Sequence, residues 1–213
     1  MEMESNLMNA YLTAYEMACK ELANRDVDDI CLNTNANRIF GEDTLITLNY
    51  LASDYTINMK SGEITENGSD KQVSTTVKVL LLHYLLNSKI SPLTGRMISF
   101  KEIPGGGAIY YQTFYKRAIT PLIKTFSNDI DGFFNAAEKL GGVRERYGDA
   151  SVTLKIFPLV PVTYVIWQGD EEFPASGTIL FDEKVTNFLP GEDIVLAASF
   201  GVYALMAEAR KKQ

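Results

Sequence analysis

The chain has 213 residues, of which 46% are hydrophobic and 22% charged, close to the averages for globular proteins, which excludes a disordered or a fibrous chain. Lysine and arginine number 20 and the acidic residues 27, giving a net charge of −7 that opposes binding to phosphate backbones or anionic lipid. We therefore expect neither nucleic acid nor a membrane as a partner. At this length we expect a single domain, residues 1–213, that needs no staple.

Few residues of this chain can hold a metal. Cys19 and Cys31 are its two cysteines and His83 its single histidine, too few for a tetrahedral Cys/His site or for a cluster held by four cysteines. We therefore expect no metal centre of these kinds and no cofactor. The amino-terminal residues lack the basic flank and long apolar core of an export signal, and no apolar run reaches the ~18 residues that cross a bilayer. These features predict a cytoplasmic protein.

The first predicted element is an amphipathic helix from about Glu4 to Ala23, because apolar residues recur there at three- and four-residue steps. Residues 24–29 are polar and predict a connection with room for one short helical turn. Residues 33–37 are rich in asparagine and predict a loop.

The next segment predicts a meander of short strands. Residues 44–51 and 54–59 are rich in β-forming types, with Ser53 and Asp54 suited to a tight turn between them. A further turn leads to a short strand at Ile64.

A helix from Val77 to Asn87 follows, with Ser74 or Thr75 as its cap, and it is apolar nearly all round, which predicts an interior position. His83 lies within it. A catalytic histidine would need a carboxylate or nucleophile brought to it by the fold, whereas the alternative is a core histidine bonded to the backbone or to a hydroxyl.

Further elements are predicted towards the carboxyl end. They are a short strand at 97–100, an aromatic helix at 110–126 broken or bent at Pro121, a helix at 130–140 that stops at Gly141, and a last helix from Pro190 to about Arg210.

The centre of the fold is expected at residues 151–182. Residues 157–167 carry no charge and are mostly β-branched or aromatic, which predicts a buried central strand. It should pair with an alternating strand before it and a strand at 178–181 after it, and Pro158 and Pro161 should force a bend or bulge. The expected fold class is α+β, with a mainly antiparallel sheet packed against several helices.

An acidic turn follows the central strand. Asp170, Glu171 and Glu172, with Asp182 beyond the next loop, could hold Mg²⁺ or Ca²⁺ through carboxylate oxygens, although no calcium-loop spacing is present. The alternative is a solvated rim that keeps the protein soluble and discourages edge pairing. Trp167, at the start of this turn, is either the floor of a cleft or part of the core.

A glycine triplet offers a second candidate. Gly105, Gly106 and Gly107 precede a helix that carries Lys116 and Arg117, so amides at the helix start could receive a phosphate or carboxylate. The triplet matches neither common phosphate-loop pattern, and a chain reversal that requires glycine is the alternative. Aromatic residues of the same helix could line a pocket or form core.

Four segments carry a family resemblance: LLLHYLL, PLTGRMISFKEIPGG, PLVPVTYVIWQGDEEFPASGTILFD and FLPGED, in this order. Together they resemble a family of bacterial and archaeal domains of unknown function, common in anaerobes, some of whose members are joined to ferredoxin-like iron–sulfur segments. The resemblance covers nearly the whole chain and supplies no catalytic residue. It implies a context of anaerobic iron–sulfur or corrinoid metabolism, with any cluster on another protein because this chain has no cysteine-rich motif.

The first hypothesis is an accessory domain that binds another protein or a small anionic ligand at one surface, made by the Gly105 loop and the Trp167 turn. The alternative is an enzyme acting on a small anionic metabolite, with Arg96, Lys116 or Arg117 neutralising the anion and Asp170 or Glu172 as general base. A metal-dependent module is a third possibility. Whether the chain is an enzyme stays open at this point.

Overall fold

The computed structural model describes residues 2–41, 43–105 and 107–211. The chain divides into two compact units: unit 1 comprises residues 1–91 and 187–189, and unit 2 comprises residues 92–186 and 190–213. Each unit combines an antiparallel sheet with helices, which confirms the predicted α+β class. The expectation of one domain over the whole chain stays a prediction.

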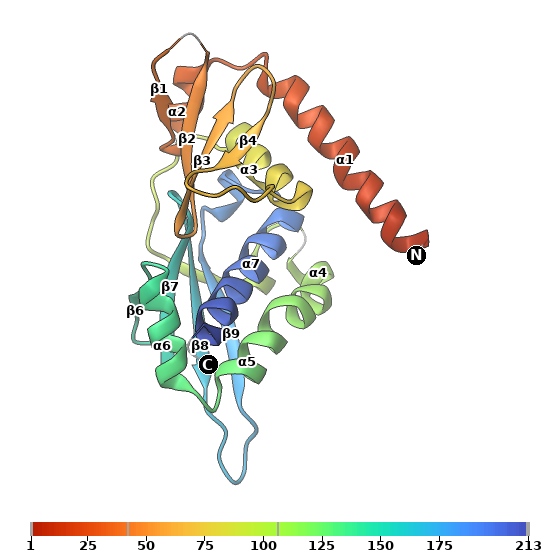
Figure 1. Cartoon of the computed structure of the whole chain (residues 1–213). Coiled ribbons are helices and arrows are strands. Elements are labelled where there is room, and N and C mark those ends of the chain that lie inside the picture. The colour runs from red at the N-terminus through yellow and green to blue at the C-terminus, as the bar shows by residue number, and fades with distance from the viewer. Residues whose placement is uncertain (1, 42, 106, 212–213) are drawn as a thin grey trace. The chain divides into compact units, whose positions relative to one another are not determined.

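Unit 1 contains an antiparallel meander in the strand order β1-β2-β3-β4, in which β2, β3 and β4 were predicted and β1 was not (Figure 1). Its elements are α1 (Glu2–Leu22), α2 (Val27–Thr34), β1 (Asn37–Ile39), β2 (Leu45–Tyr50), β3 (Ser53–Asn58), β4 (Ile64–Glu66) and α3 (Thr75–Asn87). Helix α1 packs along α3, and α2 contacts α3 and β1. The inward side chains Ile46, Leu48 and Ile57 are almost fully buried, so this sheet supplies part of the core of unit 1.

The turn between β2 and β3 lies two residues earlier than predicted. Tyr50 pairs with Ser53, and Leu51, with φ of 53°, makes the turn together with Ala52. The Asn49 side chain donates to the Asp54 carboxylate at 2.9 Å across the strands. Serine and aspartate favour turns locally, but the alternating burial of β2 ends at Tyr50 and Ser53 pairs with it, so the turn comes earlier and Ser53 and Asp54 belong to β3.

The predicted connection after α1 contains a full helix, α2. Its cap is Asp26, whose carboxylate accepts from the amides of Asp28 at 2.8 Å and Asp29 at 3.1 Å. The helix ends at Thr34, and Asn35 follows in the left-handed region with φ of 55°. The loop predicted over residues 33–37 is therefore wrong at both ends, because it overlaps α2 and the start of β1.

Helix α3 occupies the predicted interior position. Ser74 caps it by accepting from the Val77 amide at 3.4 Å. Leu80 to Leu82 are fully buried, and the Tyr84 hydroxyl donates to the Thr34 carbonyl at 2.8 Å, which links α3 to α2. His83 is only partly buried.

Unit 2 contains a five-stranded antiparallel sheet in the order β5-β9-β8-β7-β6, with β8 at its centre as predicted. Its elements are β5 (Met97–Ser99), a 3-10 turn η1 (Phe100–Glu102), α4 (Gly107–Phe114), a π-helical turn η2 (Tyr115–Ile119), α5 (Thr120–Phe126), α6 (Ile130–Lys139), β6 (Val143–Arg144), β7 (Ala150–Phe157), β8 (Val160–Trp167), β9 (Ser176–Asp182) and α7 (Gly191–Arg210). Helices α5, α6 and α7 contact this sheet.

The predicted irregularity between β7 and β8 is present. Lys155 pairs with Pro161 and Phe157 with Val160, so the register shifts between Lys155 and Phe157. A proline in β8 has no amide hydrogen for the ladder, and a bulge at this position accommodates that loss.

The aromatic helix predicted at 110–126 is interrupted, as expected, and the interruption begins before Pro121. It is the π-helical turn η2, in which the Thr120 amide donates to the Tyr115 carbonyl. Because Pro121 has no amide hydrogen, it cannot bond to the carbonyl of Arg117. That carbonyl accepts instead from the Tyr203 hydroxyl of α7 at 3.1 Å, so the interruption becomes a contact between helices.

Helix α7 lies close to β8 because of one glycine. A methyl group at Gly201 would overlap the hydroxyl of Tyr164, a fully buried side chain of β8. That hydroxyl donates to the Ala198 carbonyl at 3.1 Å. The small residue therefore permits the close approach expected of this helix.

We expect Gly201→Ala to lower the free energy of unfolding by about 1–3 kcal/mol, because the added methyl group displaces either Tyr164 or α7. Gly191→Ala is the matched control on the same helix, since no atom outside its chain neighbours lies within 4 Å of the added carbon. The control should leave stability unchanged or raise it by up to about 1 kcal/mol. Urea denaturation of both variants measures the effect, and equal stabilities would contradict this account of the packing.

Candidate functional site

The predicted site residues lie in separate places in unit 2. The last residue of β8, Trp167, is 41% exposed although the strand before it is buried. The loop that follows, residues 168–175, joins β8 to β9 and extends beyond the neighbouring elements of unit 2 in Figure 1. We call residues 167–175 the hairpin tip. Its other large apolar side chain, Phe173, is 67% exposed.

Asp170 holds the hairpin tip in shape. Its carboxylate accepts from the amides of Glu172 at 2.8 Å and Phe173 at 2.7 Å, and its own amide donates to the Phe173 carbonyl at 2.9 Å. The bonds from the Phe173 and Glu172 amides hold the pKa of the Asp170 carboxyl below its ordinary value. The tip is a hydrogen-bonded turn, and this carboxylate is a weak base.

The base of the hairpin is anchored on two sides. The Gln168 amide donates to the Asp149 carboxylate at 2.8 Å, and the Gln168 side chain donates to the Ser127 carbonyl at 3.1 Å, just after α5. Gly148, with φ of 58°, leaves room for the Trp167 ring, because a Cβ added at Gly148 would lie 3.2 Å from Cε2 of that ring. Tyr147, beside this glycine, is 42% exposed. Trp167 therefore sits on a fixed support.

The acidic residues do not gather into a cation site. Glu171 and Glu172 are exposed at the tip. Asp182, at the far end of β9, is buried and accepts from the amides of Thr94 at 2.9 Å, Gly95 at 2.7 Å and Lys184 at 2.9 Å. Within the described ranges, no group of three or more His, Cys, Asp or Glu residues is placed to hold a metal ion.

The glycine loop is shaped by a left-handed backbone at Gly105 and by close packing at Gly107. Gly105 has φ of 82°, and a methyl group on Gly107 would overlap the Phe100 carbonyl oxygen. A chain reversal that requires glycine, which was the alternative to an anion site, therefore explains these two glycines. Gly106 lies outside the described residues.

The single surface expected from the glycine loop and the hairpin tip is not formed. Gln168 contacts Ser127, directly after α5, whereas Gly107 begins α4. The helical segment from Gly107 to Phe126 rises about 1.5 Å per residue, which separates its ends by roughly 30 Å. Figure 1 likewise shows α4 towards the end of unit 2 away from the hairpin tip.

The predicted basic residues are also dispersed. Arg96 lies near the end of β9 opposite the tip, where its carbonyl accepts from the Glu183 amide at 3.0 Å and its exposed guanidinium pairs with the Glu183 carboxylate at 3.4 Å. Lys116 and Arg117 are exposed on η2. At about 3.3 Å per residue, β9 separates Arg96 from the tip by roughly 20 Å, so Arg96 and the acidic residues of the tip do not border one site.

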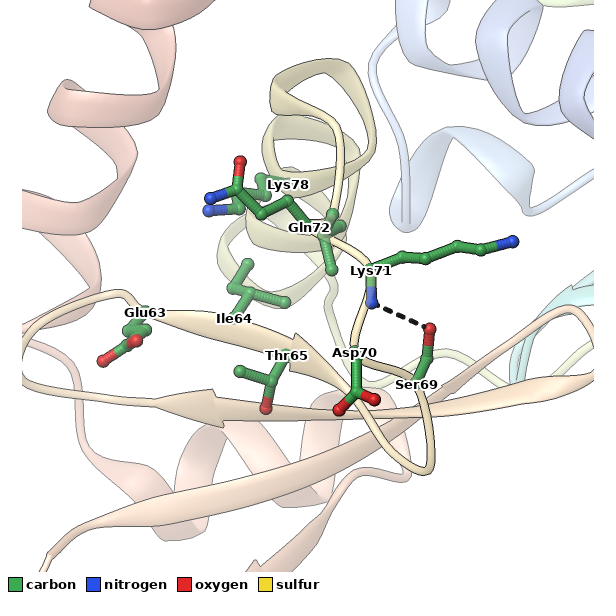
Figure 2. Close-up of a pocket in the computed structure, with 9 residues that line it drawn as sticks. Glu63, Ile64, Thr65, Ser69, Asp70, Lys71, Gln72 and Lys78 are labelled. Carbon is green, nitrogen blue, oxygen red and sulfur yellow. Dashed lines mark hydrogen bonds between the residues drawn. The ribbon is translucent and has the colours of Figure 1, made fainter.

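Unit 1 contains a pocket that the sequence analysis did not predict, shown in Figure 2. Its volume is about 310 Å³, and it lies between β4, the segment before α3 and the first turn of α3. The lining residues are Glu63, Ile64, Thr65, Ser69, Asp70, Lys71, Gln72, Val73 and Lys78. None of the predicted site residues that the structure describes lines it.

Lys78 connects this pocket to α1. Its Nζ lies 5.3 Å from the centroid of the Tyr15 ring, and the Tyr15 hydroxyl donates to the Gly62 carbonyl at 2.7 Å. Burial raises the pKa of Tyr15 to about 12, with the Cys19 thiol and the Glu63 carboxylate adding to the rise. Tyr15 is therefore a neutral phenol at physiological pH.

Cys19 lies beside the same carbonyl. Its Sγ is 4.0 Å from the Gly62 oxygen, and burial raises its pKa despite the opposing effect of Tyr15 and Lys78. Gly62 has φ of 73°, and a methyl group there would overlap the Cys19 sulfur. The turn after β3 is thus fitted against α1, and the raised pKa of Cys19 disfavours the reactive thiolate form.

One feature of the sequence could have indicated the pocket. Lys78 is the only charged residue of α3 apart from the titratable His83, and a cation in an otherwise apolar helix needs a local partner. The hydrophobic pattern assigned the whole helix to the core, which it is from Val79 onward. The aromatic partner comes from α1, and periodicity gives no information on that contact.

A model of the family "Domain of unknown function (DUF3786)" matches residues 26–204. No curated protein and no solved structure matches the sequence. Over the described part of the chain, no helix is both long and apolar enough to cross a membrane.

The lowered pKa of Asp170 predicts that the hydrogen bonding of the hairpin tip depends on pH. Since the folded-state value lies below the unfolded-state value, the carboxylate supports the turn above the ordinary aspartate pKa, and this support is lost as the pH falls through the lowered value. In an NMR titration the amide shifts of Glu172 and Phe173 should follow that lowered value. Asp170→Ala should abolish this titration and speed amide exchange at both residues. An ordinary aspartate pKa at Asp170 would contradict the hydrogen bonding described here.

Two glycines allow the contact between α1 and the β3–β4 turn to be measured. Gly62 and Gly68 both have positive φ, near 74°, so alanine at either position costs about 1–2 kcal/mol in backbone strain. Only Gly62 faces Cys19, and nothing lies within 4 Å of a Cβ at Gly68. Chemical denaturation should therefore show Gly62→Ala less stable than Gly68→Ala by about 1 kcal/mol or more. Equal losses would mean that α1 does not press on this turn.

Proposed function

The chain belongs to the DUF3786 family of domains of unknown function, and from this premise we propose that it is an accessory domain that binds another protein through the hairpin tip. The observation that carries the proposal is the exposure of Trp167 and Phe173 on a loop fixed by hydrogen bonds. Tryptophan and other aromatic residues are enriched among the residues that dominate the energy of protein interfaces.

The fixed shape of the tip supports binding. Asp170 bonds two amides of the loop, and Gly169 packs so tightly against Ala175 that a Cβ there would lie 2.7 Å from the Ala175 nitrogen. A loop already ordered before association loses little conformational entropy on binding, so more of its contact energy appears as affinity. The same order favours a binding role for these exposed aromatic residues over an incidental one.

The charge of the tip indicates the chemistry of the partner. Glu171 and Glu172 are exposed beside the aromatic residues, and the chain has a net charge of −7. A complementary surface has an apolar recess for Phe173 with lysine or arginine at its edge. This charge disfavours nucleic acid and anionic membrane as partners.

The proposal extends to the cellular setting. The resemblance to a family in which some members are joined to ferredoxin-like segments supports a redox protein as partner, in anaerobic iron–sulfur or corrinoid metabolism. The cluster or corrinoid would belong to the partner. Cys19 and Cys31 are both free thiols, which supports a reducing compartment such as the cytoplasm.

The enzyme hypothesis receives less support from the geometry. Arg96 and the candidate general bases of the hairpin tip lie at opposite ends of β9, and the Asp170 carboxylate is occupied by two backbone amides. A carboxylate with a lowered pKa accepts a proton poorly at neutral pH. We therefore favour binding over catalysis at this surface.

The test is photo-crosslinking followed by a binary binding measurement. A photo-reactive phenylalanine analogue replaces Phe173 in one variant and, in the control, Phe40, an aromatic residue of unit 1 that is even more exposed. We expect a protein from the native host to crosslink at position 173 alone. With that protein purified, Trp167→Ala with Phe173→Ser should weaken binding by roughly 30-fold or more, whereas Phe40→Ser should not.

Two controls make the result decisive. The melting temperature of the double variant should stay close to that of the original protein, since both side chains are exposed. Glu171→Lys with Glu172→Lys should slow association, with a smaller effect at high salt. Crosslinks shared by both positions, or an affinity unchanged by the double variant, would refute the hairpin tip as the binding surface.

A further inference from the structure

We propose that the pocket of unit 1 binds a small organic carboxylate with a short apolar tail, and that Lys78 binds the carboxylate group. This site is independent of the hairpin tip, because every residue that forms it belongs to unit 1 and the tip belongs to unit 2. The pocket would be the binding site of the small anionic ligand expected from the sequence, which was expected at the glycine loop.

The charge of Lys78 is the first observation that favours an anionic ligand. The side chain is partly buried, and among the described residues no carboxylate forms an ion pair with it. Its neighbour is the face of Tyr15, which stabilises the cation and leaves its N–H groups free to donate elsewhere. A partly desolvated ammonium at the edge of a pocket favours an anion as ligand, because an anion supplies the missing charge partner.

The direction of the surrounding side chains is the second reason. In Figure 2, Gln72 and Lys78 extend in the same direction, whereas Glu63 and Asp70 point away from them. The carboxylates that line the pocket are thus not directed at the ammonium. The Gln72 amide can donate to a second oxygen of a bound carboxylate, as the geometry of that group requires.

The apolar side chains of the pocket indicate the chemistry of the rest of the ligand. Ile64 is buried and points to the same side of β4 as the pocket, and Val73 contributes a second apolar side chain. The other seven of the nine lining residues are polar or charged, so the apolar part of the pocket has room only for a short tail beside the charged group. A volume of about 310 Å³ is at the lower end for small-molecule sites and suits a molecule the size of butyrate or benzoate.

The neutral state of Tyr15 agrees with this assignment. Its hydroxyl is used by the Gly62 carbonyl, so Tyr15 offers Lys78 a ring face and no negative charge. An ionised phenol would neutralise the ammonium and remove the reason to bind an anion. The contact between α1 and the Gly62 turn therefore keeps the lysine available.

The experiment is an NMR titration of the full chain with sodium butyrate and sodium benzoate at constant ionic strength. We expect saturable shifts of the amides of Ile64, Gln72 and Lys78 and no change at Trp167 or Phe173. Butyramide and benzamide, which have the same tails without charge, should give no saturable shift. Lys78→Gln should weaken butyrate and benzoate binding by about tenfold or more.

Three variants separate binding from folding. Lys71→Gln is the matched control, because it removes one positive charge from the same rim while the Lys71 side chain points away from Lys78 in Figure 2, and it should bind almost as the original protein does. Lys78→Arg should retain binding, and Gln72→Leu, an exposed position, should weaken it without loss of folding. Absence of a saturable response to either carboxylate, equal binding by the amides, or unchanged affinity in Lys78→Gln would overturn the proposal.

Discussion

The structure of unit 2 depends on the burial of β8 along almost its entire length. Tyr164 and Ile166 on one face and Thr163 and Val165 on the other are all inaccessible to solvent, so the strand offers no surface for a ligand. Trp167 is the one exposed residue of β8, and its position is fixed by packing against Gly148 and by the hydrogen bonds of Gln168. The position and stiffness of the hairpin tip both follow from the packing of the strand before it.

Unit 1 has to accommodate one positive charge, Lys78, in the otherwise apolar helix α3. Lys78 precedes the fully buried part of α3, and Tyr15 covers it from α1. The two units therefore present opposite kinds of surface. Unit 2 carries a projecting loop with acidic and aromatic side chains, and unit 1 a small, mostly polar recess with Lys78 at its edge and Ile64 and Val73 in its lining.

Local pattern was sufficient for most elements. The uncharged run at β8, the proline-induced bulge, the apolar α3 with its Ser74 cap and the glycine after α6 all follow from propensity and periodicity. Failures occurred where tertiary contacts decide. The turn at Leu51 is set by burial of Tyr50, and α2 by an aspartate cap within a polar segment. The expected surface failed because about 60 positions of chain separate its two halves, and nothing local reveals that a helical rod keeps them apart.

Both thiols of the protein belong to unit 1, and Cys19 lies in the seam between α1 and the Gly62 turn. The sulfur is partly covered by the Gly62 turn while α1 is docked, so detachment of this helix should raise the rate at which an alkylating reagent modifies Cys19. Cys31, on α2, supplies an internal reference within the same unit. Alkylation of the two natural cysteines therefore measures the opening of unit 1, and it gives no information on the sheet of unit 2.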